Sequence, residues 1–285
     1  MPEGTISYTD ANLTEAVLGR IRPDADPRMA EIMAALIRHA HAFVREVRLT
    51  PEEWGKAIGF LTEMGRWCDD KRSEWILLSD VTGVTMLVDA LAHATDEAVT
   101  ETTVLGPFHR ENPPVFESGA NISPGMPGER LEVAVRIADA EGRPIPGAQL
   151  DVWHASREGG YDSQIGDGEA HNMRGRFRSD AEGMVRFTTI APAFYPVPHD
   201  GPVGRVLAAM GRGPMRPAHV HFWIKAPGYR DLITHIFAAG DPYLAEDAVF
   251  GVKASLVQDF TRARREGRSE HLMLEYEFRL PRQVG

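Results

Sequence analysis

The sequence predicts an α+β protein, with a helical N-terminal region followed by an antiparallel β-sandwich. Up to about residue 100, apolar residues recur at three- and four-residue spacing, as they do on one face of a helix. After residue 130, apolar and polar residues alternate in short runs separated by turn residues, as in antiparallel strands. We therefore expect a helical domain over 1–100, a linker over 101–130 that wraps around the second domain, and a β-sandwich domain over 131–285.

Three helices are predicted in the first domain. The first, over residues 26–44, begins with Asp-Pro, which are favoured residues for the N-cap and for the first helical position. The second, over residues 50–67, begins with Thr-Pro-Glu-Glu, a capping box with proline at the first helical position. The third is predicted from about residue 75 to residue 93, where apolar residues keep helical spacing.

The second domain is predicted from short alternating runs. Turns such as Ala-Glu-Gly at residues 140–142 separate them, and one helix, roughly Asp247 to Arg265, interrupts the series. The linker is rich in proline and glycine and has poor periodicity. The predicted strands are 131–137, 148–153, 185–189, 219–224, 232–237 and 272–280.

Composition excludes several classes of protein. The net charge of -10, without a long basic run, argues against nucleic-acid or anionic-membrane partners. Cys68 is the only cysteine, so an intramolecular disulfide cannot form and a metal site must use histidine, carboxylate or tyrosine. The N-terminus has no signal-peptide pattern, and no apolar run is long enough for a membrane span. We expect a cytoplasmic protein.

His219 and His221 are the first candidate metal ligands. Alternate residues of a strand share one face, so the two imidazoles of Arg216-Pro-Ala-His-Val-His-Phe222 lie on the same side. Neutral imidazoles are good ligands for transition metals. His39 and His41 have the same spacing in a helical pattern, where such residues diverge. By itself, the strand pair is also compatible with two histidines that bind nothing.

Two of the six tyrosines are candidate partners for these histidines. Tyr161 and Tyr195 each lie in an irregular loop rich in glycine or proline just after a strand, a common place for ligands. A trivalent iron stabilises phenolate far below the ordinary tyrosine pKa of ~10. Tyrosines also often pack beside prolines, so spacing leaves both interpretations open.

Three segments resemble the signature blocks of the intradiol ring-cleaving dioxygenases, in the catechol 1,2-dioxygenase branch. They are Asp151-Val-Trp-His-Ala-Ser-Arg-Glu-Gly-Gly-Tyr161, Tyr195-Pro-Val-Pro-His-Asp-Gly-Pro202 and the segment Arg216–Phe222. The similarity extends to the helical region and the linker. Within the family, the chain is most similar to hydroxyquinol 1,2-dioxygenases. Three features carry this similarity: the segment Tyr161-Asp-Ser-Gln164, the segment Asp241–Lys253, and His235, which stands where catechol-cleaving relatives usually carry glutamine.

The resemblance implies one non-haem Fe(III) per subunit, bound by Tyr161, Tyr195, His219 and His221 with water or hydroxide. Two phenolates and a hydroxide favour the ferric state, in contrast to the two-histidine, one-carboxylate set of Fe(II) oxygenases. In the family, Tyr195 dissociates and accepts a proton from a substrate with adjacent hydroxyls, and O2 then attacks the ring carbon. The product from hydroxyquinol is 3-hydroxy-cis,cis-muconate, which tautomerises to maleylacetate.

The resemblance also assigns residues around the substrate. Arg216 is expected to stabilise negative charge on the activated ring, and a surface ion pair is its alternative. His235 is expected to form a hydrogen bond near the substrate or an iron ligand, and a strand histidine with a purely structural role is its alternative. Asp80 is a candidate for recognising the third hydroxyl, or else an exposed helix residue. The expected pocket residues are Leu77, Asp80, Val104, Leu105, Gly106, Phe194 and Val249.

A homodimer is expected through the N-terminal helices, because residues 29–44 carry more apolar side chains than one buried face requires. The family often binds a phospholipid at this interface, whereas a cap packed within one chain is the alternative. The rival functions are a catechol or substituted-catechol 1,2-dioxygenase that forms cis,cis-muconates, a metal-free β-sandwich binding protein, and an Fe(II) oxygenase. The last would need a carboxylate ligand, and none adjoins the histidine pair in sequence.

Overall fold

The structure is a computed structural model that describes residues 7–69, 72–93, 98–165, 171–264 and 270–283. The chain divides into two compact units, Met1–Thr62 and Glu63–Gly285. The first unit contains α1 (Leu13–Leu18), α2 (Pro27–Val47) and most of α3 (Pro51–Arg66). Both predicted helix starts are confirmed: Asp26 Oδ1 accepts a hydrogen bond from the Met29 amide at 2.7 Å, and Thr50 and Glu53 form the capping box.

The helix α2 has no buried residue. Its apolar side chains face solvent instead of a core, and this pattern is typical of a surface that a partner covers. The exposed large apolar residues of α2 are Met29, Ile32, Met33, Leu36, Phe43, Val44 and Val47.

The predicted third helix is two helices, α4 (Glu74–Val81) and α5 (Val84–Ala92), which meet at an angle of 75°. The prediction of one continuous helix was wrong because Gly83 adopts φ +77°, a left-handed conformation that ends α4. Among the described residues, no single helix meets the length and hydropathy needed to cross a membrane, although this bent pair meets them jointly.

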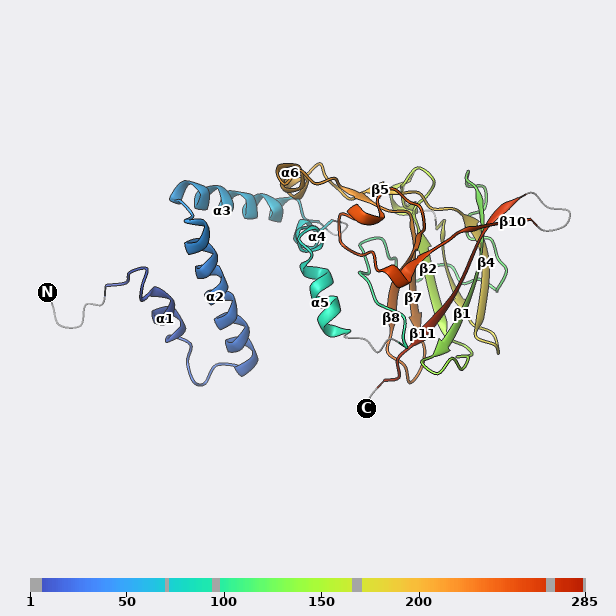
Figure 1. Ribbon diagram of the computed structural model, residues 1–285, viewed down its shortest axis with the longest axis horizontal. Coiled ribbons are helices and arrows are strands. Elements are labelled where there is room, and N and C mark those ends of the chain that lie inside the picture. Colours follow the sequence, from blue (N-terminus) through green and yellow to red (C-terminus); the bar gives the residue numbers. More distant parts are fainter. Residues whose placement is uncertain (1–6, 70–71, 94–97, 166–170, 265–269, 284–285) are drawn as a thin grey trace. The chain divides into compact units, whose positions relative to one another are not determined.

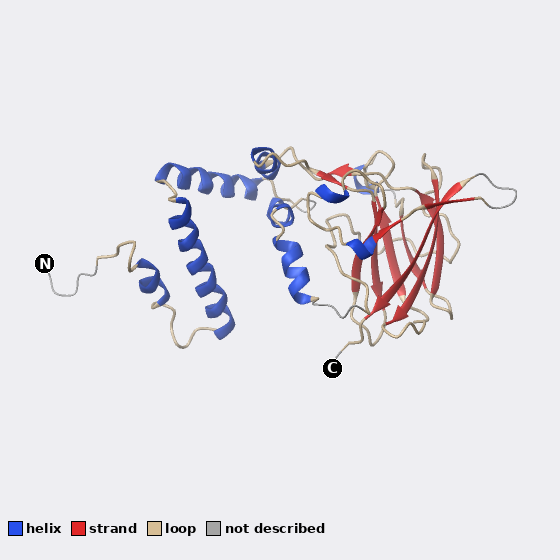
Figure 2. Ribbon diagram, viewed as in Figure 1, coloured by secondary structure: helices blue, strands red, loops and turns tan. Residues whose placement is uncertain are grey.

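Two sheets pack face to face in the second unit (Figures 1 and 2). One has the strand order β10-β11-β1-β4, and the other has the order β3-β2-β7-β8-β9. The apolar side chains of both sheets form one core, which includes Val133, Val135, Phe222 and Phe278. The main strands are β1 (Arg130–Asp139), β2 (Gln149–His154), β3 (Arg174–Arg178), β4 (Met184–Ile190), β7 (His219–Lys225), β8 (Leu232–Ala238) and β11 (His271–Leu280).

The sheets are mixed, which corrects the expectation of antiparallel sheets. The strand β1 pairs parallel with β11, and β8 pairs parallel with β9 (Val257–Gln258). A parallel pair needs a long connection, and the whole domain lies between β1 and β11. The short strand β10 (Thr261–Ala263) forms an antiparallel pair with β11.

The helix predicted over 247–265 is absent from the described part of this segment, and residue 265 itself lies outside the described residues. The segment forms a loop, a short 3-10 turn (Ala254–Leu256), β9 and β10. The Asp247 carboxylate accepts hydrogen bonds from the backbone amides of Val249 and Gly251, and Phe250 adopts φ +57°. These local bonds compete with helix formation.

The proline- and glycine-rich segment before β1 has little regular structure, but its backbone is fixed to both sheets. The Thr103 amide donates to the Ile233 carbonyl, the Phe116 amide to the Arg176 carbonyl and the Ile122 amide to the Thr188 carbonyl. Its first residues therefore run beside β8, which carries His235.

Candidate metal centre

Three adjacent strands place an aromatic row at the centre of one sheet. His221 of β7 lies opposite Trp153 of β2 on one side and opposite His235 of β8 on the other. The Trp153 ring stacks on the His221 ring with centroids 4.7 Å apart. The His235 ring contacts the His221 ring edge-on, with centroids 4.1 Å apart. His219 shares the face of His221, as strand periodicity predicts. All three histidines are at most 1% exposed.

The two tyrosines reach this face from neighbouring loops. Tyr161 precedes a 3-10 turn (Asp162–Gln164), and its amide donates to the Gln164 side chain at 3.0 Å. Tyr195 lies in β5 (Tyr195–Pro196), directly opposite Arg216 in β6 (Met215–Arg216). Gly159 has φ +85°, and a Cβ atom there would lie 2.8 Å from Tyr195 Cβ. A glycine is therefore required for the two loops to approach so closely.

The four predicted ligand atoms meet in one buried cluster. The Tyr161 hydroxyl lies 3.1 Å from the Tyr195 hydroxyl and 2.8 Å from His221 Nε2. His219 Nε2 lies 3.1 Å from His221 Nε2. The Nδ1–H of His219 donates to the Pro217 carbonyl at 2.6 Å, which leaves the Nε2 lone pair directed at the cluster. His235 brings a third imidazole within 4.8 Å of the other two.

Burial controls the protonation of these groups. It lowers the pKa of His219 to about 3 and the pKa values of His221 and His235 well below the ordinary value. Burial, with a contribution from Tyr195, raises the pKa of Tyr161 well above its ordinary value. The imidazoles are therefore neutral and available as ligands, whereas the Tyr161 phenol keeps its proton unless a cation displaces it.

Aromatic side chains exclude water from the cluster. The Phe108 ring stacks on Tyr161 with centroids 4.1 Å apart, and it meets the Tyr195 ring edge-on at 6.4 Å. Leu105 packs against the same apolar group, which includes Trp153. The donor atoms therefore lie in a low-dielectric environment, where a bound charge interacts strongly with its ligands.

A buried set of charges adjoins the histidines. Arg216 is 3% exposed, and its Nη1 lies 3.3 Å from His219 Nε2. The same guanidinium forms an ion pair with Asp247, with 3.0 Å between Nε and Oδ1. Asp80 is 7% exposed, and burial raises its pKa while Arg216 acts in the opposite direction. Arg216 and Asp80 are both buried, and neither is the exposed surface residue considered as its alternative.

The other predicted pocket residues divide into two groups. Gly106 borders His221, since a Cβ atom there would lie 3.3 Å from the imidazole, and the Val104 backbone lies beside His235. Leu77 is buried one turn before Asp80 on α4, and Val249 is buried in the loop that holds Asp247. Phe194, in contrast, is 43% exposed, and its ring contacts Tyr243.

Sequence reasoning missed several residues that support the cluster. Asp162 and Arg174 form a buried bidentate ion pair directly after Tyr161, and Arg174 also donates to the Phe108 carbonyl at 3.1 Å. Asp247 lies in the segment that resembles the hydroxyquinol subgroup, but it was interpreted as part of a helix. The one available signal in the sequence was a charged residue among apolar neighbours. If such a residue is buried, its carboxylate needs a partner, which predicts an ion pair.

The donor set fits a small transition-metal ion. Two imidazole nitrogens and two phenol oxygens converge with neighbouring contacts of 2.8–3.1 Å. Separations of about 3 Å are expected between ligands that each lie ~2 Å from one ion. Hard oxygen donors beside imidazoles suit iron better than a soft thiolate-binding metal.

Comparison with known proteins identifies the family to which the chain belongs. The profile of the family described as "Dioxygenase" matches residues 105–282, and the profile "Catechol dioxygenase N terminus" matches residues 26–100. A 6-chlorohydroxyquinol 1,2-dioxygenase of Cupriavidus pinatubonensis is 48% identical over 90% of this chain and 92% of that protein. A hydroxyquinol 1,2-dioxygenase of a Rhizobium species is 47% identical over 93% of this chain and 90% of that protein.

A solved structure extends the agreement to three dimensions. The hydroxyquinol 1,2-dioxygenase of Pseudomonas putida DLL-E4 superposes with a TM-score of 0.91 at 43% sequence identity. The match covers 96% of this chain and 99% of that one, and thus both the helices and the sandwich. Members of this family use non-haem iron, and the buried histidines are consistent with it. The chain belongs to the intradiol ring-cleavage dioxygenases and has the N-terminal domain of the catechol dioxygenases.

Proposed function

We propose that this enzyme is a hydroxyquinol 1,2-dioxygenase, which uses O2 to cleave 1,2,4-trihydroxybenzene between its two adjacent hydroxylated carbons. The product would be 3-hydroxy-cis,cis-muconate, which tautomerises to maleylacetate. One observation carries the proposal: two phenol oxygens and two imidazole nitrogens meet in a single buried cluster. The names of relatives 43–48% identical to the chain favour hydroxyquinol as the substrate.

The ligands in this proposal are Tyr161, Tyr195, His219 and His221, which bind one Fe(III) ion per chain. When bound, the ion supplies the positive charge that holds both phenols deprotonated and chelates adjacent substrate oxygens, so that O2 reacts with the ring. The stacked Phe108 and Trp153 rings support the assignment, because they keep the ligand side chains in one orientation.

Three side chains would act on the substrate. Tyr195, whose hydroxyl lies 3.1 Å from that of Tyr161, would be the metal ligand that also accepts a substrate proton. Arg216 stabilises negative charge on the bound substrate through the N–H group nearest the ligands. His235, neutral and fully buried, forms a hydrogen bond to the substrate or to a ligand.

The substrate ring would lie between α4 and the part of the segment before β1 that runs beside β8. Leu77, Val104, Leu105 and Val249 supply apolar contact, Gly106 leaves room beside His221, and Phe194 lies at the rim. Asp80 would bind the hydroxyl that distinguishes hydroxyquinol from catechol. The second candidate function is cleavage of catechol to cis,cis-muconate, which needs no such hydrogen bond.

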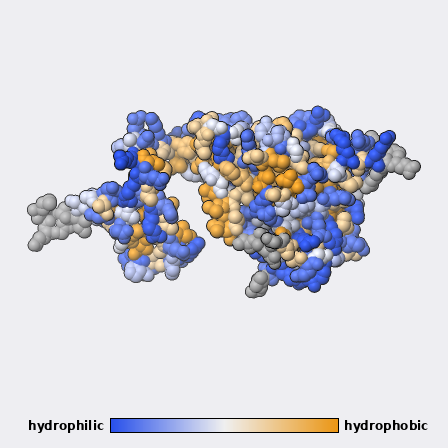
Figure 3. All heavy atoms as spheres, in the orientation of Figure 1, coloured by the Kyte–Doolittle hydropathy of each residue, from blue (hydrophilic) through white to orange (hydrophobic). Residues whose placement is uncertain are grey.

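The enzyme would form a homodimer through its N-terminal helices. The helix α2 exposes an apolar face, and α5 exposes Val84, Leu87, Val88 and Leu91 (Figure 3). A second copy with a phospholipid in the interface would cover these side chains, since exposed apolar patches of this kind mark interaction surfaces. A cytoplasmic location remains a prediction.

The visible spectrum of the anaerobic protein tests the proposed site. Phenolate-to-Fe(III) charge transfer should colour the resting enzyme red, and hydroxyquinol should move the band more strongly than catechol. Tyr161→Phe should alter the band, whereas Tyr276→Phe, on β11 outside the cluster, should leave it unchanged. Equal responses to both substrates would favour a general catechol 1,2-dioxygenase. A protein that stays colourless after ferric reconstitution would refute the tyrosinate site.

A further inference from the structure

Asp247 is the buried partner of Arg216, and none of the roles described above uses it. The Arg216 Nε lies 3.0 Å from Asp247 Oδ1, and Nη2 lies 3.4 Å from Oδ2. The two side chains are only 4% and 2% exposed. Burial raises the pKa of Asp247, but the attraction of Arg216 outweighs it, and the net effect is a lowered pKa. Both groups are therefore ionised at neutral pH.

The loop around Asp247 is built to hold this carboxylate in place. Its Oδ2 accepts a hydrogen bond from the Gly251 amide at 2.9 Å. A Cβ atom at Gly251 would lie 3.1 Å from Arg216 Nη2 and 3.2 Å from Asp247 Oδ2. A larger residue at this position would therefore press on the ion pair and displace it slightly.

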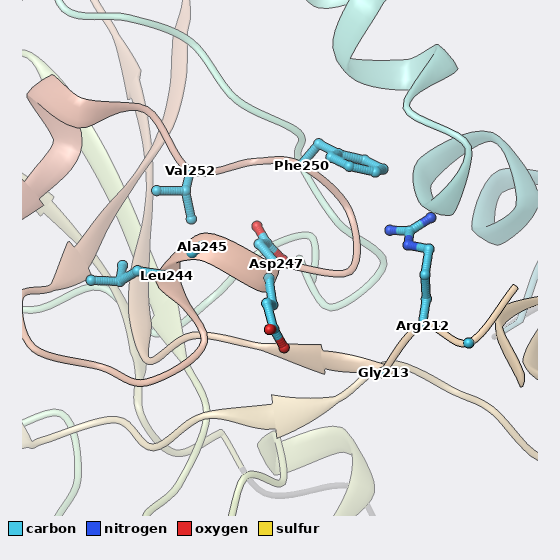
Figure 4. Close-up of a pocket in the computed structure, with 9 residues that line it drawn as sticks. Arg212, Gly213, Leu244, Ala245, Asp247, Phe250 and Val252 are labelled. Carbon is cyan, nitrogen blue, oxygen red and sulfur yellow. The ribbon is translucent and has the colours of Figure 1, made fainter.

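A second arginine fixes the same loop to the helix that carries Asp80. Arg212 donates to the Ala248 carbonyl at 3.0 Å and to the Val81 carbonyl at the end of α4. Its guanidinium lies 4.5 Å from the centre of the Phe250 ring, and Asp247 and Phe250 line the same pocket of about 520 Å³ (Figure 4). The loop is thus held to α4 by the residues that directly follow Asp247.

The ion pair determines which part of the guanidinium faces the ligands. Because Nε and Nη2 are both directed at Asp247, Nη1 is left to face His219 Nε2 at 3.3 Å. Without the carboxylate, rotation of the Arg216 side chain would turn a different N–H group toward the substrate.

We propose that Asp247 is a positioning residue, which fixes the Arg216 guanidinium so that Nη1 faces the ligand cluster and which affects the reaction only through that arginine. The inference rests on the proposed function, in which Arg216 contacts the bound substrate. It assigns no contact between Asp247 and the substrate or the metal.

A double-mutant cycle tests this dependence. Asp247→Asn should lower kcat/KM for hydroxyquinol by about 10–100-fold, the usual effect of removing a partner that orients an active-site group. In an Arg216→Gln background, the same change should alter kcat/KM by less than about threefold, because the group it positions is gone. Equal losses in the two backgrounds would overturn the proposal.

Two further variants separate positioning from stability. Gly251→Ala keeps both charges but displaces the guanidinium slightly, and it should lower kcat/KM by about three- to tenfold. Asp139→Asn removes a different buried carboxylate, paired with Arg143 at the end of β1, and should lower the thermal midpoint without changing kcat/KM. Full activity in both Asp247→Asn and Gly251→Ala, or an equal loss in Asp139→Asn, would contradict the inference.

A measurement on metal-free protein separates this inference from the proposed function. In NMR spectra of 15N-arginine-labelled protein, Arg216 should give a slowly exchanging Nε–H signal that disappears in Asp247→Asn. If that signal is retained, the positioning role is refuted. If the signal is lost but the iron-loaded wild type does not cleave hydroxyquinol, the orientation of Arg216 by Asp247 holds and the proposed function fails.

Discussion

Replacing Asp80 by alanine should impair cleavage of hydroxyquinol far more than cleavage of catechol. The Asp80 side chain is 7% exposed, and its Oδ1 atom has no hydrogen-bond partner among the described residues. Burial raises its pKa, although a hydrogen bond with the Thr85 side chain and the charge of Arg216 partly offset this effect. A buried carboxyl oxygen without a partner is costly, and a substrate hydroxyl would supply a partner for Oδ1.

The size of the effect follows from the energy of one such bond. A hydrogen bond that involves a charged group contributes ~1.5–3 kcal/mol, which corresponds to a loss of roughly 10–160-fold in kcat/KM. Catechol lacks the third hydroxyl, so its kcat/KM should change by less than about threefold. Any small cavity left by the substitution affects both substrates and cancels in the ratio of their kcat/KM values.

Oxygen uptake by the iron-loaded enzyme, measured with each substrate at several concentrations, gives this ratio. Asp80→Asn is the matched control, because the amide keeps a hydrogen-bonding group of the same size, and it should retain part of the preference for hydroxyquinol. Iron content should be the same in all three proteins. Equal losses for hydroxyquinol and catechol would refute the assigned role of Asp80.

Three other predictions concern the support of the site. Gly159→Ala would place a Cβ atom 2.8 Å from Tyr195 Cβ, so the purified variant should contain less iron by elemental analysis; full iron content would show that the loops can separate without harm. Asp162→Asn leaves the buried Arg174 without its counter-charge, at a cost of about 3–5 kcal/mol, and calorimetry should show a thermal midpoint lower by roughly 6–20 °C. A fall of less than about 2 °C would contradict that estimate. Burial lowers the pKa of His154 from 6.5 to about 4. Between these pH values the unfolded chain binds a proton that the native protein does not, so stability that is present above pH 6.5 is lost as the pH falls toward 4. The thermal midpoint of metal-free protein should therefore decrease as the pH is lowered from 6.5 to 4. This decrease per pH unit should be smaller in His154→Gln, and an unchanged decrease would exclude His154 as a cause.

Much of the fold could be predicted because it depends on local signals. The capping residues at Asp26 and Thr50 fix helix starts within one turn, and alternation predicted the six longest strands that the described residues form. The break at Gly83 was missed because the apolar spacing of α4 and α5 continues across it. The loop at Asp247 was missed because its apolar residues mimic helical spacing, while the bonds that form it come from its own carboxylate.

The same limit applies to the site. His219 and His221 could be paired from strand periodicity alone, since the period of two is a local property. Tyr161 and Tyr195 required a resemblance to a family, because nothing in their spacing indicates that two loops meet at Gly159. Arg174 pairs with Asp162, next to Tyr161, and Asp247 pairs with Arg216. The two residues of each pair lie far apart in sequence, so no local pattern predicts these contacts.

The parallel pair of β1 and β11 has a consequence for how the protein is made. Arg136 and Glu277, which face each other across this pair, lie 141 residues apart. Because β11 is synthesised long after β1, the β1 edge that pairs with β11 stays open until β11 has left the ribosome. The sandwich therefore closes only once β11 has emerged, and a nascent chain that stalls before residue 271 would leave this edge of β1 unpaired and open to aggregation.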